Sequence, residues 1–166
     1  MANIVLIGMP GCGKSTVGVV LAKHMGYRFI DSDLLIQERE HRLLSEIIEQ
    51  EGLDRFDQIE EEVNASIEAE HAVIATGGSV VYGPKAMEHL RNIGTVVYLK
   101  LSYEEIADRL GDLTARGVSV REGQTLRNLY DERIPLYEKY AHVVIDAEHQ
   151  WLRDTVKVIR QRLEQL

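Results

Sequence analysis

The sequence has a single cysteine, only three prolines and no long hydrophobic run. Because Cys12 has no second cysteine to pair with, the chain cannot contain an internal disulfide, which is typical of a reducing compartment. Its apolar runs have the length of strands and fall well short of the about 20 residues that a membrane-spanning helix needs. The first of them begins without a preceding signal peptide. We therefore expect a cytoplasmic protein with no membrane partner.

Positive charge is also scarce, since 19 Lys and Arg residues face 27 Asp and Glu residues and give a net charge of −8. The basic residues are scattered, which argues against a nucleic-acid surface. At 166 residues, 45% of them hydrophobic, the chain is long enough for one domain spanning 1–166 but too short for a separate substrate domain. We expect a monomer that acts on a small molecule.

Residues 8–16, Gly-Met-Pro-Gly-Cys-Gly-Lys-Ser-Thr, match the pattern G-x-x-x-x-G-K-[ST] at every fixed position. The apolar run 4–7 before them is typical of a buried parallel strand. Apolar residues at helical spacing follow from residue 17. The order of strand, glycine-rich loop and helix predicts a phosphate-binding loop and therefore a nucleotide-binding protein.

The residue types of this loop fit polyphosphate binding. Glycines allow a tight turn in which successive N–H groups face an anion, with the positive end of the next helix behind them. Lys14 can reach the β- and γ-phosphates, Ser15 can ligate Mg²⁺, and Thr16 can contact the α-phosphate. The expected nucleotide-binding residues of the loop are Gly11, Cys12, Gly13, Lys14, Ser15 and Thr16.

Further strands are predicted at 27–31, 72–75, 95–99 and 141–146, with helical patterns between them, so we predict an α/β fold with a parallel sheet. Polar or glycine-rich segments follow two of these strands, 31–33 and 77–79, at the sheet edge that carries the phosphate loop. The charged helical region 34–70, which Gly52 should interrupt, is expected to bind the acceptor of a transferred group. The polar segment 111–123 is expected to form a lid.

With these residues in view, the chain resembles the shikimate kinases, within the nucleoside monophosphate kinase-like group of P-loop proteins, over nearly its whole length. The matching segments are 8–16, 29–33, 52–60, 74–78, Arg109 and 133–137. The resemblance implies a three-layer P-loop fold with a five-stranded parallel sheet of order 2-3-1-4-5, a helical acceptor-binding insertion and a lid. It also implies transfer of the γ-phosphoryl group of ATP, with Mg²⁺, to an acceptor hydroxyl.

The resemblance also implies roles for single residues. Asp33 would orient or deprotonate the acceptor hydroxyl, while Lys14 and Arg116 would neutralise charge on the transferring phosphoryl group. Asp31 would support the Mg²⁺ shell through water, beside Ser15. Arg109 would pack on the adenine, and Arg133 would hold an acceptor carboxylate. The expected substrate-binding residues are Asp33, Asp57, Gly77, Gly78, Ser79 and Arg133.

Three positions depart from the family pattern. Asp57 stands where the family has a substrate-binding arginine, Ser79 replaces a third glycine, and residues 116–118 read Arg-Gly-Val in place of Arg-Pro-Leu. Two residues along a helix is about 200° around its axis, so Arg55 should point away from the face of Asp57. The acceptor is therefore either shikimate, held through Arg133, or a cationic or neutral alcohol such as an amino alcohol, a hydroxy amino acid or a polyol.

Two further interpretations stay open. Residues 60–62 are three glutamates that should form a solvated helix face, although Glu60 could line the acceptor site. From a different class of function, the chain could be a nucleotide-binding module without catalysis. The presence of Asp31, Asp33 and Arg116 beside the loop argues against that module, since a binder would need the loop alone.

Overall fold

The computed structural model describes residues 3–110 and 121–166. Its five strands form one parallel sheet in the order β2-β3-β1-β4-β5, as the family resemblance implied. From the central strand β1 the chain passes through α1 to β2 at one edge of the sheet, and it later continues from β1's other side with β4 and β5. The strand order therefore reverses next to β1, and a crevice opens there at the carboxyl end of the sheet. The strands are β1 (Asn3–Ile7), β2 (Arg28–Asp31), β3 (Ala72–Ala75), β4 (Gly94–Lys100) and β5 (Val143–Asp146).

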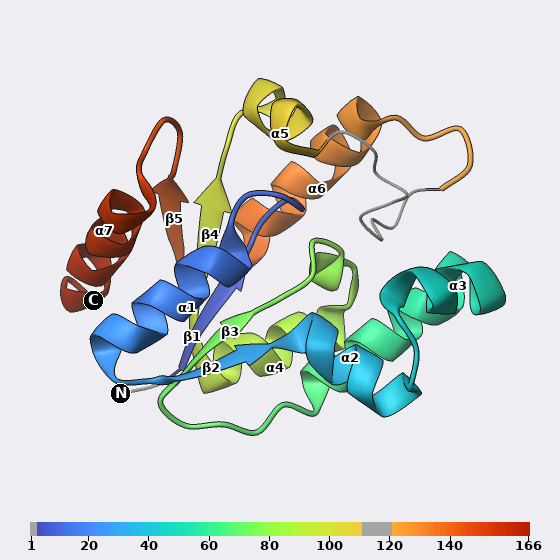
Figure 1. Cartoon of the computed structure of the whole chain (residues 1–166), viewed down its shortest axis with the longest axis horizontal. Helices are drawn as coiled ribbons and strands as arrows, with labels where there is room; N and C mark the ends of the chain where they lie inside the picture. Colours follow the sequence, from blue (N-terminus) through green and yellow to red (C-terminus); the bar gives the residue numbers. More distant parts are fainter. Residues whose placement is uncertain (1–2, 111–120) are drawn as a thin grey trace.

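Helices cover both faces of the sheet, which gives three layers (Figure 1). α1 and α7 pack together on one face, and α4 and α6 lie against the other. α2 and α3 project beside the β2 edge, at the right of Figure 1. The helices are α1 (Lys14–Met25), α2 (Ser32–Glu40), α3 (Leu44–Ala65), the 3₁₀ turn η1 (Val80–Tyr82), α4 (Pro84–Ile93), α5 (Tyr103–Leu110), α6 (Leu126–Tyr140) and α7 (Leu152–Glu164).

The main hydrophobic core lies between the sheet and these helices. Every residue of β1 and β3 is buried, which explains why both strands read as continuous apolar runs without alternation. Each fully buried Ile, Leu or Val contributes about 1.5–3 kcal/mol relative to an exposed position. The stable part of the molecule is therefore the sheet, and the loops at its carboxyl edge are held on a rigid base.

The segment 34–70 forms a helical lobe with a small core of its own. Five buried side chains of α2 and α3 make up that core: Ile36, Ile47, Phe56, Ile59 and Val63. α3 is interrupted at Gly52, whose φ of 83° and ψ of 169° are not helical, as the sequence predicted. α2 begins at Ser32, slightly before the predicted start of the lobe, because the side chain of Asp31 caps it.

The predicted lid 111–123 falls largely outside the described residues, and so does Arg116. Only its last three residues are described, in a turn that leads to α6. No helix in residues 3–110 and 121–166 is both long enough and apolar enough to cross a membrane.

Candidate active site

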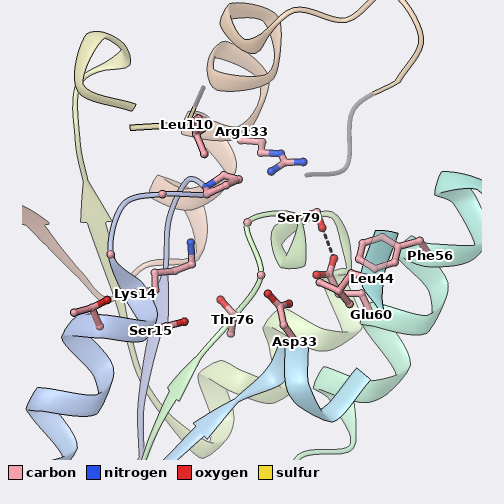
Figure 2. A pocket seen from close by; sticks show the side chains of 16 residues that line it. Lys14, Ser15, Asp33, Leu44, Phe56, Glu60, Thr76, Ser79, Leu110 and Arg133 are labelled. Carbon is pink, nitrogen blue, oxygen red and sulfur yellow. Dashed lines mark hydrogen bonds between the residues drawn. The ribbon is translucent and has the colours of Figure 1, made fainter. Parts of the chain in front are cut away.

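A cavity of about 420 Å³ opens at the carboxyl edge of the sheet (Figure 2). The phosphate loop borders it on one side, while Asp33 of α2 borders it on the other, next to Phe56 and Glu60 of α3. The segment 76–79 after β3 forms part of its wall, and Arg133 of α6 lies above that segment in Figure 2. The structure thus brings the loop and most of the predicted acceptor residues into one cavity.

Lys14 is the buried cation of the phosphate loop, with 8% of its surface exposed. Its Nζ donates to the carbonyl oxygens of Gly8 at 2.7 Å and Met9 at 3.0 Å, and lies 3.7 Å from the Sγ of Cys12. These contacts hold the ammonium group across the mouth of the loop. A phosphate that enters the loop therefore meets a positive charge that is already in position.

The loop has the backbone that an anion nest requires. Gly11 has a φ of 80° and Gly13 a φ of 97°, a left-handed region that other residues rarely adopt. Gly13 is also the N-cap of α1, so the positive end of that helix faces the cavity. Thr16 lines the cavity, whereas the Cys12 side chain is 4% exposed and packs into the main core. The Cys12 thiol therefore does not face the cavity, and the Cys12 backbone N–H donates to the carbonyl oxygen of Met9 at 3.2 Å.

Asp31 links the phosphate loop to α2. Its Oδ2 accepts a hydrogen bond from the Ser15 hydroxyl at 3.1 Å, and its Oδ1 accepts from the backbone N–H of Asp33 at 3.0 Å. The second bond is an N-cap, which places Asp33 in the first turn of α2 with its side chain toward the cavity. Hydroxyl and carboxylate oxygens side by side are the ligands that Mg²⁺ prefers, so Ser15 and Asp31 fit a magnesium site.

Asp33 has the environment of a tuned acid or base. Its Oδ1 is buried and has no hydrogen-bond partner among the residues that the structure describes. Burial, followed by the charge of Asp31, raises the pKa of Asp33 from 3.8 to about 6, against the opposing effect of Lys14. A carboxylate of this pKa is mostly ionised at pH 7 and can accept a proton from a nearby hydroxyl.

Glu60 is fully inside the site, so its predicted place on a solvated face was wrong, and the alternative prediction that it lines the acceptor site agrees with the structure. It is 2% exposed and its Oε1 accepts a hydrogen bond of 2.6 Å from the hydroxyl of Ser79 (Figure 2). Burial raises the pKa of Glu60 to about 8, against the lowering effect of the Ser79 hydrogen bond. Glu60 is therefore mostly neutral at pH 7. Its position one turn after the core residue Phe56 is the signal that places it on the buried face.

The two glycines after β3 are needed because other groups approach them closely. A Cβ on Gly77 would lie 2.7 Å from Glu60 Oε2 and 2.8 Å from Asp33 Oδ1. A Cβ on Gly78 would lie 2.7 Å from Pro10 and 3.0 Å from a guanidinium nitrogen of Arg133. The segment 77–78 thus brings its backbone between the two acids and the arginine.

Arg133 is the cation of the predicted acceptor region and is 1% exposed. Its guanidinium lies 5.2 Å from the ring centre of Tyr82, and its Nε donates to the Tyr82 hydroxyl at 3.3 Å. Tyr137, on the same helix, donates to the carbonyl oxygen of Gly78 at 2.6 Å and ties α6 to that wall of the cavity. Arg133 is therefore held in a fixed position, which suits recognition of a carboxylate.

Asp57 does not line the main cavity. It borders a second cavity of about 180 Å³ together with Tyr82 and Arg121, and its Oδ2 lies 3.9 Å from Arg121 Nη2. Arg55 contacts Gln58 and Glu62 on another face of α3, as the helical geometry predicted. The proximity of Arg121 to Asp57 was not predicted, because residues 111–123 show no helical or strand periodicity from which Arg121 could be placed.

Arg109, predicted to pack on the adenine, lies at the outer rim of the phosphate loop. It pairs with Glu105 at 2.8 Å one turn earlier in α5 and donates to the carbonyl oxygen of Gly11 at 3.3 Å. Its packing on the adenine stays a prediction.

A parallel sheet of this order, a phosphate loop after β1 and a carboxylate facing that loop define a P-loop phosphotransferase of the nucleoside monophosphate kinase-like class. The family model that matches the chain is shikimate kinase, over residues 10–164. The chain belongs to the shikimate kinase family.

Individual relatives agree with this assignment. The chain is 43% identical over 151 residues to a shikimate kinase of Paracidovorax citrulli, covering 88% of this chain and 82% of the relative. It is 39% identical over 144 residues to one of Clostridium botulinum, covering 86% of each chain. Among solved structures, a shikimate kinase from Acinetobacter baumannii in complex with shikimate superposes with a TM-score of 0.90 at 34% identity, covering 99% of this chain and 94% of the other.

Proposed function

We propose that the chain is a kinase that transfers the γ-phosphoryl group of ATP to a hydroxyl of shikimate or a closely similar hydroxy carboxylic acid. The observation that carries the proposal is the single cavity that holds Lys14, Asp33 and Arg133 together. In that cavity the cation for the phosphates, the acid for the hydroxyl and the cation for a carboxylate lie on different walls. Family membership supports the same reaction.

The chain's own residues can perform the transfer by positioning and electrostatics. The loop and Lys14 hold the phosphates and offset their charge. The Asp33 carboxylate accepts a hydrogen bond from the acceptor hydroxyl and takes its proton as the oxygen attacks. Ser15 and Asp31 would hold Mg²⁺, which supplies charge neutralisation on the phosphate oxygens. We propose Arg116 and Arg109 for the remaining charge and for the adenine, as the family resemblance implies.

The charges around the acceptor region favour an anionic acceptor over a cationic one. Asp57 faces Arg121 at 3.9 Å, so its negative charge is partly compensated. Glu60 is mostly neutral at pH 7 because burial raises its pKa to about 8. Arg133, whose charge is permanent, then faces the cavity together with Asp33. Asp57 alone is therefore a weak reason to prefer an amino alcohol.

The test is acceptor-stimulated release of ADP from Mg-ATP, measured with shikimate, an amino alcohol, a hydroxy amino acid and a polyol. We expect shikimate to give the highest kcat/KM. A preference for the amino alcohol would replace the acceptor in this proposal and restore the charge of Asp57 as the reason. ATP binding without stimulation by any acceptor would refute the kinase and favour a nucleotide-binding module.

We further propose that the chain works as a single-domain monomer in the cytoplasm. The lone Cys12 supports a reducing compartment, and a length of 166 residues supports one domain. Size-exclusion chromatography with light scattering tests the monomer directly, since a dimer would double the mass of 18.8 kDa.

A further inference from the structure

The second cavity adjoins the acceptor region. Phe56 and Asp57 are consecutive on α3, and Phe56 borders the main cavity while Asp57 borders the second one. Tyr82 also borders the second cavity and is in contact with the Arg133 guanidinium. The two cavities are thus bordered by consecutive residues of α3, and Tyr82 of the second cavity contacts Arg133 of the first.

A second guanidinium, that of Arg121, borders the smaller cavity. Arg121 starts the turn before α6, where its backbone carbonyl accepts from the Gln124 N–H at 3.0 Å and its own N–H donates to the Gln124 side chain at 3.2 Å. Its Nη2 donates to Asp54 at 3.0 Å and lies 3.9 Å from Asp57. Two carboxylates of α3 therefore hold the guanidinium at the wall of the second cavity.

We propose that Arg121 is an acceptor-specificity residue that supplies, beside Arg133, the second cation for the acceptor carboxylate; this inference rests on the proposed function. Asp57 is the residue that positions Arg121. Asp57 thus acts through Arg121 and not on the acceptor. A guanidinium has five N–H donors in a planar fork, and both contacts with α3 are made by one nitrogen, so the group can bind a carboxylate and Asp57 together.

The electrostatics of Asp57 agree with this geometry. Burial raises the pKa of the Asp57 carboxyl, while Arg121 and then Arg133 lower it, and Asp54 raises it again. The two guanidinium groups thus act on the same carboxylate from different elements, the turn before α6 and α6 itself. Arg55 offers no such contact, because its guanidinium lies 3.7 Å from Glu62.

Asp57→Asn distinguishes the proposal from simple charge repulsion, because the two predict opposite changes in the KM for shikimate. If Asp57 repelled the acceptor, Asn would lower the KM for shikimate. If Asp57 positions Arg121, Asn should raise that KM about threefold while kcat stays within twofold, since the reacting groups are untouched. A lowered KM would overturn the proposal.

Arg121→Gln tests whether the guanidinium binds the acceptor carboxylate, when its effect on shikimate is compared with its effect on an ester that lacks the negative charge. We expect the KM for shikimate to rise about tenfold, as for loss of a hydrogen bond between charged groups, and the KM for shikimate methyl ester to change less than twofold. Arg121→Lys should recover part of the loss. Arg55→Gln is the matched control on α3 and should leave both constants unchanged, and KM for Mg-ATP should stay within twofold in every variant.

If Arg121→Gln changed the KM for shikimate and for its methyl ester equally, or changed neither, this inference would be overturned. The proposed kinase function would not be affected by that result. Failure of the unmodified protein to phosphorylate either acceptor would refute the proposed function, and this inference with it. The two failures are distinguished by the wild-type measurement alone.

Discussion

Replacing Asp33 with asparagine should make the protein more stable and nearly inactive. The substitution keeps the shape of the side chain and its place in the first turn of α2, but it removes a charge that the fold holds away from water. An amide cannot take the proton of an acceptor hydroxyl, so kcat should fall by 10²-fold or more, within the range of about 10²–10⁴ for general-base catalysis. Stability and activity are thus opposed at this position.

The size of the stability effect follows from the pKa. Burial and Asp31 raise the pKa of Asp33 from 3.8 to about 6, and the difference of about 2 corresponds to about 3 kcal/mol. Because a raised carboxyl pKa favours the neutral form in the fold, the contribution to stability is fully present below pH 3.8 and is lost as pH rises through about 6. Above that pH the neutral amide should gain up to about 3 kcal/mol.

Urea unfolding of the two proteins at pH 8 and at pH 5 measures this difference. We expect the free energy of unfolding of the variant at pH 8 to exceed that of the wild type by up to about 3 kcal/mol, and the difference to be smaller at pH 5. Asp131→Asn, at an exposed carboxylate of α6, is the control and should change little. The kcat/KM of the wild-type protein should fall below about pH 6, where Asp33 takes up its proton. A variant no more stable at pH 8, or fully active, would refute the reasoning.

Three further outcomes are expected. Lys14→Ala should weaken Mg-ATP binding and turnover together, unlike Asp33→Asn, which should leave Mg-ATP binding nearly intact; calorimetric titration with Mg-ATP separates the two. Gly77→Ala should lower kcat strongly, because its Cβ would lie 2.7–2.8 Å from the carboxylate oxygens of Glu60 and Asp33. Gly83→Ala would crowd the side chain of Glu61, which does not line the cavity, and should keep its kcat. Ser79→Ala should lower the free energy of unfolding by about 1–3 kcal/mol, since Glu60 would lose its hydrogen bond; an unchanged urea midpoint would contradict this.

The phosphate loop and the buried strands could be predicted because their patterns are local. The loop depends on residue types at fixed spacing, and β1 and β3 are short apolar runs between turn signals. Asp31 and Asp33 could be placed at the site because the carboxyl ends of parallel strands meet at one edge. The strand order, by contrast, came from the family resemblance, and the structure confirms it.

The acceptor side could be predicted less well because it depends on contacts between distant segments. The burial of Glu60 depends on Ser79, 19 residues away, which supplies its hydrogen-bond partner. The charge near Asp57 depends on Arg121, which lies on the far side of the predicted lid. Neither contact produces a periodic pattern in the sequence, so the sequence left shikimate and a cationic or neutral alcohol as alternative acceptors.

The two hydrogen bonds that the Asp31 carboxylate accepts connect the nucleotide side of the site with the acceptor side. One carboxylate oxygen accepts from Ser15 at the nucleotide side, and the other caps the helix that carries Asp33 at the acceptor side. Because the carboxylate is planar and rigid, a ligand that turned it on one side would also shift the start of α2 on the other. Binding of the two substrates would then be coupled, and the coupling would be reciprocal: the factor by which the nucleotide changes acceptor affinity would equal the factor by which the acceptor changes nucleotide affinity.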